Sequence, residues 1–237
     1  LADLGVDPGL LARHEVHVIA VNGDAAGARY TLLGATVHVL QEGTRRAGAW
    51  QFVDALRSAG PFDVIHVFWA GRAALVAAIA GRLMGTPVVL SLCGGELVAQ
   101  PDIRYGGALT SRGRATVRLA LRLADRVTAA SEPMRTLARP FRADVERIPL
   151  GVDIGRFRPA SGETAPRPGP PWRLLHVGSL NAVKDQATLL HAFTRVADEL
   201  PGVSLDIVGE DTLGGAVQRL ASSLGLAAIC LDGEMDP

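Results

Sequence analysis

"WRLLHVGSLNAVKDQATLLHAFTRVADELPGVSLDIVG", residues 172–209, places one stretch of helical periodicity between two short apolar runs. The runs "RLLHV" and "SLDIV" predict buried strands, and "QATLLHAFTRVADEL" predicts an amphipathic helix. Two parallel strands need a crossover connection of this length, usually a helix. The stretch therefore predicts a strand–helix–strand unit of a parallel sheet.

The same alternation runs through the rest of the chain. Further strands are expected at 14–21, 36–40, 63–69, 87–93, 126–131, 145–150 and 227–233, and further helices at 49–59, 72–85, 114–124 and 215–226. Apolar strands that alternate with amphipathic helices indicate parallel sheets covered on both faces. We expect an α/β protein with two doubly wound units, the second incomplete because it has only three strands.

Charge and composition change at one place in the chain. Residues 1–159 hold 19 arginines and 14 acidic residues, whereas residues 160–237 hold 5 basic and 10 acidic residues. Between these halves lies "PASGETAPRPGPP" (159–171), whose proline and glycine content is typical of a linker. The sequence predicts a first domain at 1–159, a linker at 160–171 and a second domain at 172–237.

Composition argues against several classes of protein. The chain is 48% hydrophobic, but no apolar run reaches the ~20 residues of a membrane span. Cys93 and Cys230 have no CxxC partner, the six histidines lack zinc-site spacing, and no GxGxxG occurs. We expect no metal, no cofactor, no nicotinamide-dependent oxidoreductase and no nucleic-acid binding, in a reduced, cytoplasmic setting.

Lys184 is the only lysine among 24 basic residues, and it stands between a predicted strand and a predicted helix. In α/β folds ligands bind beyond the carboxyl ends of the strands, and the N–H groups of a helix start attract anions. Gly178, Ser179 and Lys184 are therefore expected to hold a diphosphate. Glu210, after the next strand, is placed to approach a nucleotide. The alternative is a plain turn with a solvated lysine.

Two further features carry functional hypotheses with structural alternatives. In "CGGELV" (93–98), Cys93, Gly94 and Gly95 allow a close backbone approach, and Glu96 could accept sugar hydroxyls or simply favour a helix start. In the helix within 111–124, Arg114, Arg118 and Arg122 share one stripe. This stripe is either a solvated face or a contact with an anionic membrane.

Four stretches in register resemble the family-4 retaining glycosyltransferases of GT-B fold. They are "FDVIHVFWAG" with "TPVVLSLCGGEL", "ADRVTAASEPMRTL", "RIPLGVDIGRFRP" and "LLHVGSLNAVKDQATLLHAF" with "PGVSLDIVGED". The resemblance implies transfer of a sugar from a nucleotide-sugar donor to a sugar, lipid-linked or small-molecule acceptor, with retention at the anomeric carbon. It also implies donor binding by the second domain and acceptor binding by the first, without a metal.

The chain departs from the family's pattern at several positions. Ser179 stands where arginine is usual, Asp185 where glycine follows the lysine, Leu150 where asparagine is common, and Cys93 where histidine is common. The family's later acidic motif would lie beyond residue 237 and its first strand before residue 1, so we expect a chain cut at both ends and inactive alone. Another GT-B enzyme, an epimerase or a phosphorylase, and a non-catalytic nucleotide-sugar-binding module stay open as alternatives.

Overall fold

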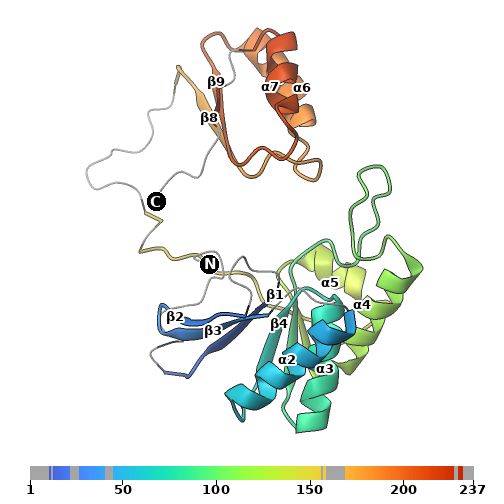
Figure 1. Ribbon diagram of the computed structural model, residues 1–237. Helices are drawn as coiled ribbons and strands as arrows, with labels where there is room; N and C mark the ends of the chain where they lie inside the picture. The colour runs from blue at the N-terminus through green and yellow to red at the C-terminus, as the bar shows by residue number, and fades with distance from the viewer. Residues whose placement is uncertain are drawn as a thin grey trace. The chain divides into compact units, whose positions relative to one another are not determined.

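The computed structural model describes residues 11, 13–21, 27–40, 45–155, 157–158, 169–226 and 229–231. Its contacts divide the chain into two compact units, Leu1–Gly151 and Val152–Pro237. The predicted linker at 160–171 lies outside the described residues except for its last three positions, so its structure stays a prediction. Each unit is α/β, as expected, and each is described by itself (Figure 1).

The first sheet of unit 1 contains a hairpin that the sequence analysis did not predict. Its order is β1-β3-β2, with β1 (His17–Val21) parallel and β2 (Arg29–Leu32) antiparallel to β3 (Ala35–Leu40). Leu33 and Gly34 form the connection with φ values of 52° and 94°. Two-residue hairpins favour such positive values at both positions. The expectation of a purely parallel sheet is therefore wrong for β2.

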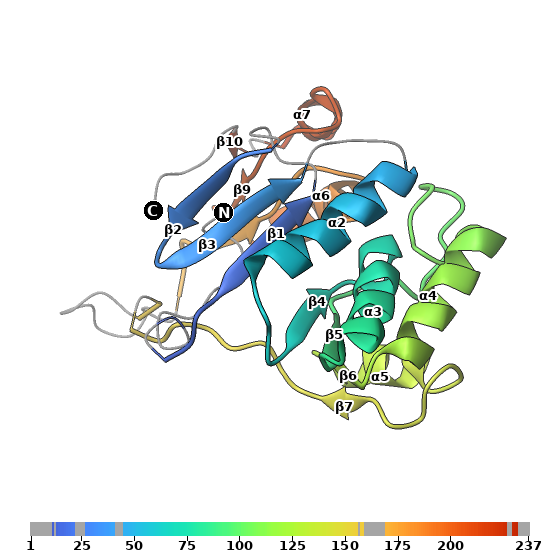
Figure 2. The same ribbon diagram turned by 60° about the horizontal axis from the view of Figure 1, so that its bottom comes forward.

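The second sheet of unit 1 is parallel throughout, in the order β4-β5-β6-β7. Its strands are β4 (Ile65–Phe68), β5 (Val88–Leu92), β6 (Arg126–Ala129) and β7 (Glu146–Arg147). Helix α2 (Arg45–Ala59) precedes β4, and α3 (Arg72–Met84), α4 (Ser111–Leu123) and α5 (Glu132–Ala138) connect the strands. The strand expected at 145–150 is thus only two residues long. Figure 2 shows α2, α3 and α4 in succession over the strands.

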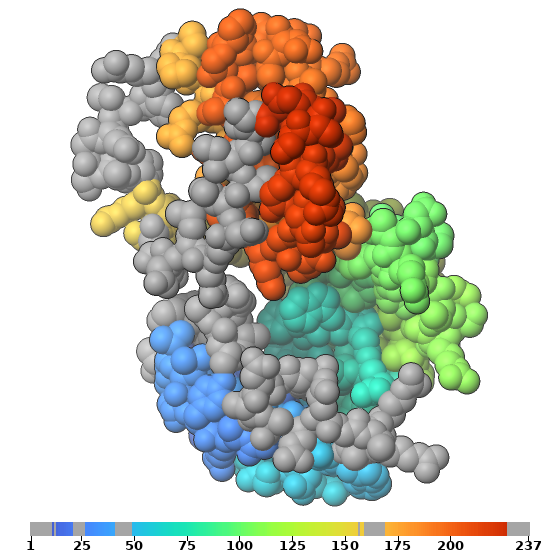
Figure 3. All heavy atoms as spheres, turned by 45° about the horizontal axis from the view of Figure 1, so that its top comes forward, coloured from blue at the N-terminus to red at the C-terminus, as the bar shows by residue number. Residues whose placement is uncertain are grey.

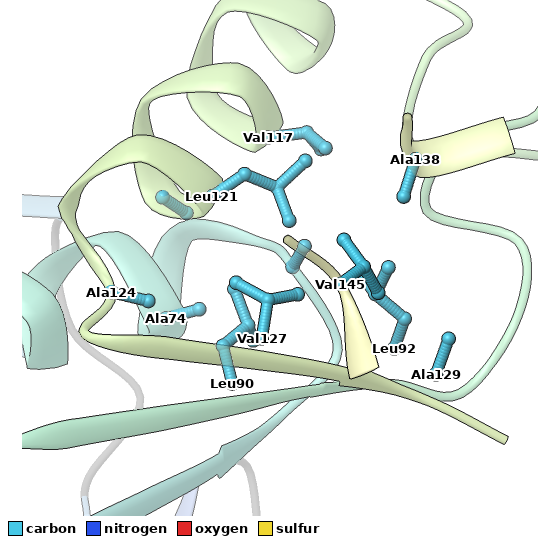
Figure 4. Close-up of a cluster of buried hydrophobic side chains, with 12 residues drawn as sticks. Ala74, Leu90, Leu92, Val117, Leu121, Ala124, Val127, Ala129, Ala138 and Val145 are labelled. Carbon is cyan, nitrogen blue, oxygen red and sulfur yellow. The ribbon is translucent and has the colours of Figure 1, made fainter. Parts of the chain in front are cut away.

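The core of unit 1 lies between these helices and the sheets. Alternate residues of β5 are buried, because successive side chains of a strand point to opposite faces. Leu90 and Leu92 meet Val117 and Leu121 of α4 in one cluster (Figure 4). A second cluster joins α2, α3, β3 and β4. These packed faces hold the carboxyl ends of the parallel strands in fixed positions.

Unit 2 is a smaller parallel sheet in the order β10-β9-β8. Strands β8 (Arg173–Val177), β9 (Ser204–Val208) and β10 (Ile229–Leu231) alternate with α6 (Gln186–Glu199) and α7 (Ala216–Ser223). Leu205 and Ile207 of β9 pack against Leu190, Phe193 and Val217 of the two helices. Helices α6 and α7 lie together on the surface of this unit (Figure 3). The strand–helix–strand prediction for 172–209 is confirmed.

Candidate functional site

The β8–α6 loop (Gly178–Asp185) is tied to the end of β9. The Gly178 N–H donates to the Val208 carbonyl at 2.9 Å, and the Leu180 N–H donates to the Glu210 carbonyl at 2.8 Å. A Cβ on Gly209 would collide with the Gly178 carbonyl oxygen, so only glycine fits where the two strand ends meet. The carboxyl ends of β8 and β9 therefore form one rigid edge.

Lys184 is exposed and lies over this edge. A Cβ added to Gly178 would lie 3.8 Å from Lys184 Cε, so the lysine stem passes the end of β8. The Asn181 side-chain oxygen accepts the N–H groups of Val183 and Lys184 at 3.1 and 3.0 Å, which fixes the turn. Ser179 is also exposed. The structure brings Gly178 and Lys184 together, with Ser179 as the next residue along the loop.

Asp185 supplies its own negative charge at the start of α6. Its carboxylate accepts the Thr188 N–H at 3.3 Å and the Thr188 hydroxyl at 2.7 Å, and these bonds lower the Asp185 pKa. Its φ is 49°, a left-handed conformation that glycine adopts most easily. This left-handed conformation explains why glycine is usual at this position in the family. In this chain the position carries a negative charge instead.

Gln186 belongs to the site although its sequence position marks only the start of the predicted helix. The side chain is 1% exposed, and its Nε2 donates to the Ser179 carbonyl at 3.0 Å. Nε2 also lies 3.3 Å from Nε2 of His176, while Oε1 is buried with no partner among the described residues. A buried amide in the first turn of α6 therefore holds the end of β8.

Glu210 and Asp211 follow β9 and have different surroundings. Glu210 is exposed, so its carboxylate is open to solvent. Asp211 accepts the N–H groups of Leu213 and Gly215, and these two bonds lower its pKa. Gly215 is the N-cap of α7, so the two bonds to Asp211 hold the loop before this helix.

The glycine-rich segment after β5 is held by its own glutamate. Glu96 is 6% exposed, and its two carboxylate oxygens accept the N–H groups of Cys93 and Gly94 at 2.9 and 2.8 Å. Gly94 and Gly95 have φ values of 121° and 82°, and a Cβ on Gly95 would collide with the Tyr105 hydroxyl. No helix starts at Glu96, because α4 begins only at Ser111. Glu96 shapes the loop rather than presenting a free carboxylate.

Trp69, at the end of β4, was not singled out from the sequence. It adopts φ 62°, which is rare for a bulky residue, and its side chain is 57% exposed. The nearby Cys93 thiol has a raised pKa because of its burial, with a further contribution from the Glu96 charge, while a bond to the Trp69 backbone acts in the opposite direction. No sequence signal marks a tryptophan for this conformation.

A row of polar side chains crosses three strands on the sheet face opposite the Leu90 cluster. His66 Nε2 lies 2.8 Å from the Ser91 hydroxyl, which lies 2.7 Å from the Thr128 hydroxyl. Burial lowers the pKa of His66. A neutral imidazole therefore ends this row.

The arginine stripe of α4 is partly engaged in the unit itself. Arg114 donates to the Ala108 carbonyl and the Ser111 hydroxyl, each at 3.0 Å, and Arg118 lies 5.3 Å from the Phe141 ring centroid. Arg122 and Leu119 are exposed on the same helix. None of the helices in the described part of the chain has the length and hydropathy of a membrane span. Within the same residues, no cluster of three His, Cys, Asp or Glu side chains could hold a metal ion.

Residues 9–151 match the family model described as "Glycosyl transferase 4-like domain". Two curated relatives are D-inositol 3-phosphate glycosyltransferases. The Streptomyces scabiei protein is 31% identical over 127 residues, which is 46% of this chain and 28% of that protein. The Streptomyces avermitilis protein is 27% identical over 190 residues, 72% of this chain and 40% of that protein. The chain thus spans well under half the length of these relatives.

Solved structures resemble the fold at low sequence identity. Sucrose-phosphate synthase from Thermosynechococcus elongatus gives a TM-score of 0.69 at 15% identity, covering 96% of this chain and 62% of that one. OtsA gives a TM-score of 0.68 at 12% identity, covering 99% of this chain and 70% of that one. Alr3699/HepE of Anabaena, in complex with UDP, gives a TM-score of 0.60 at 20% identity, covering 84% of this chain and 56% of that one. These similarities establish the GT-B type of fold that the sequence predicted.

Proposed function

Because this chain belongs to the glycosyl transferase 4-like family, we propose that the whole protein transfers a sugar from a nucleotide-diphosphate-sugar to an acceptor, with retention at the anomeric carbon. The observation that carries the proposal is the position of Lys184, which extends past Gly178 at the carboxyl end of β8. The UDP complex of the Anabaena neighbour supports a nucleotide diphosphate as ligand.

The proposed chemistry at this edge is stabilisation of the leaving group. When the bond between the sugar and the diphosphate breaks, negative charge grows on the phosphate oxygens. The Lys184 ammonium and the Ser179 hydroxyl would stabilise that charge, which is the large electrostatic contribution in such sites. The expected contribution of the Gly178 N–H is not available, because this group is already bonded to the Val208 carbonyl. In this arrangement the ammonium supplies the positive charge, and we propose that no metal ion is needed. Glu210 is proposed to lie near the nucleotide.

The acceptor is proposed to bind unit 1 near Cys93, Gly94 and Gly95. Glu96 acts there as a positioning residue, because its two oxygens are bonded to the loop backbone. The curated relatives are named for a phosphorylated cyclitol acceptor, so a small hydroxylated ring is the first acceptor class to test.

We further propose a cytoplasmic protein that touches the inner face of the membrane through α4. Exposed Leu119 beside exposed Arg122 supports this, because apolar and basic groups together favour an anionic bilayer surface. Sedimentation with vesicles containing phosphatidylglycerol tests it. Binding to these vesicles that Arg122→Glu weakens would support the contact, and equal binding of Arg122→Glu and the parent to the same vesicles would contradict it.

Calorimetry and a transfer assay together test the proposed function. The 237-residue chain is titrated with UDP, GDP and ADP, and is then incubated with the corresponding nucleotide-sugars and a panel of acceptors. We expect saturable binding of one nucleoside diphosphate without sugar transfer, because the chain spans only 28% and 40% of the length of its two curated relatives. Absence of any diphosphate binding would contradict the donor site. Turnover by this chain would contradict the expected inactivity.

A further inference from the structure

The Trp69 side chain forms the centre of an exposed surface at the carboxyl edge of β4 and β5. The backbone N–H of Trp69 donates to the Ser91 carbonyl at 3.0 Å, and the backbone carbonyl of Trp69 accepts the Gly71 N–H at 2.8 Å. Both backbone groups are thus bonded although φ is 62°. The turn thus fixes the backbone from which the exposed indole projects.

Phe68, Cys93 and Gly94, which lie at the same edge as Trp69, are apolar or uncharged. Phe68 is 42% exposed, and its ring centroid lies 6.2 Å from that of Trp69. Cys93 contacts the Trp69 backbone, and a Cβ added to Gly94 would meet nothing within 4 Å. Glu96, the carboxylate of the segment 93–98, is buried against backbone N–H groups. We call Phe68, Trp69, Cys93 and Gly94 the Trp69 surface.

We infer that the Trp69 surface binds the ring of the acceptor, a sugar or cyclitol, with its C–H face against the indole. An indole offers a large apolar face and one N–H donor, which match the C–H face and the hydroxyl edge of such a ring. Ligand sites combine aromatic walls with a few polar groups, and they lie at the carboxyl ends of parallel strands. This inference rests on the proposed function, since that function supplies the acceptor.

Tryptophan fluorescence tests the contact directly. The chain has three tryptophans, so two of them can be replaced to leave Trp69 alone. Trp50→Phe with Trp172→Phe leaves Trp69 as the sole reporter. Methyl α-glucoside and myo-inositol are the ring probes, sorbitol is the open-chain control, and octanol is the aliphatic control. We expect a saturable change in emission with at least one ring and about fivefold weaker binding of sorbitol. Saturable binding of octanol alone would overturn the inference in favour of a lipid site.

Variants at position 69 separate binding from folding. Trp69→Asn places a residue that tolerates positive φ at this position, so the thermal midpoint should stay equal or rise. Ring binding, measured by saturation-transfer NMR, should weaken about tenfold or more, whereas Trp69→Phe should stay within about threefold of the parent. The matched control is Trp50→Asn, because Trp50 is 71% exposed on α2. Equal ring affinity of parent and Trp69→Asn would overturn the inference.

UDP titration of the same samples distinguishes the two proposals. If Trp69→Asn binds rings as the parent does while Lys184→Ala loses UDP, the acceptor inference fails and the donor site stands. If rings require Trp69 but UDP never binds, the ring contact is supported and the proposed donor site fails.

Discussion

The edge of β4 and β5 in unit 1 and the edge of β8 and β9 in unit 2 are built in a similar way but expose different side chains. In both, glycines lie in the loops that follow the parallel strands, and side-chain oxygens bond to the loop backbone. In unit 1 the carboxylate of Glu96 is enclosed by N–H groups, and an aromatic ring is left exposed. In unit 2 the exposed groups are Lys184 and Glu210. The Lys184 ammonium of the second edge, which lies beside the end of β8, is the cation that we propose to bind a diphosphate.

Removal of the buried Glu96 carboxylate is expected to have the largest effect, a loss of stability of unit 1. Glu96→Ala leaves the N–H groups of Cys93 and Gly94 unpaired and should lower the free energy of unfolding by roughly 3 kcal/mol. The control is Glu132→Ala, an exposed residue paired with Arg135, which should cost at most about 0.5 kcal/mol. Urea titration measures both. Equal small losses would mean that Glu96 does not hold the loop.

Acid should destabilise unit 1 before unit 2. Burial lowers the pKa of His66, and burial with the charges of Arg29 and His17 lowers that of His38. The unfolded chain then binds more protons, so stability is lost as pH falls below about 6.5, the unfolded value. Asp185 and Asp211 in unit 2 have lowered pKa values, so their contribution persists until pH falls below about 3.9.

Single-tryptophan proteins resolve this order, with Trp50 reporting on unit 1 and Trp172 on unit 2. Urea midpoints recorded between pH 7 and 4 should decline first for the Trp50 signal. Replacing His38 and His66 with glutamine should flatten that decline. A Trp172 signal that is lost first would reverse the expected order.

Removing the negative charge at the start of α6 should sharpen the contrast between the edges. Asp185→Asn keeps a capping side chain but removes the anion beside Lys184, so UDP should bind about two- to fivefold more tightly. Asp198→Asn, on the same helix, removes an equal charge far from its start and serves as the control. Weaker UDP binding by Asp185→Asn would show that the carboxylate contributes to the ligand site.

The smallest expected effect concerns the Cys93 thiol. Since burial raises its pKa, little thiolate forms at neutral pH, and thiolate is the reactive species. With Cys230→Ser in the background, Cys93 should react with iodoacetamide several-fold more slowly than free cysteine at pH 7. Mass spectrometry follows the rate. A faster reaction than free cysteine would indicate an activated thiol instead.

The positions of most strands could be predicted because apolar runs rich in β-branched residues lack the helical periodicity of the amphipathic helices. The edge residues Gly178 and Lys184 followed from the end of such a run. The β2 hairpin could not, because its turn is Leu33-Gly34 rather than a residue pair that favours positive φ at both positions. The pairing of β2 with β3, rather than the local sequence pattern, determines that turn.

Side-chain roles at the two edges were harder to predict than their location. The sequence "GGE" is the same whether the glutamate binds a ligand or its own loop. Only the bonds of Glu96 to Cys93 and Gly94 distinguish these two roles. Gln186 and Trp69 gave no signal at all. The amide of Gln186 bonds across the loop to Ser179, and the conformation of Trp69 depends on contacts with β5.

The affinity of Lys184→Ala for UDP, compared with its affinity for uridine, tests the central claim most directly. A charge-assisted phosphate contact contributes roughly 1.5–3 kcal/mol, so calorimetry should show at least about tenfold weaker UDP binding. Uridine affinity should stay within about twofold, and Arg195→Ala, which removes an exposed cation from the same helix, should change neither ligand. Equal UDP affinity of Lys184→Ala and the parent would contradict the claim that this edge holds the donor diphosphate.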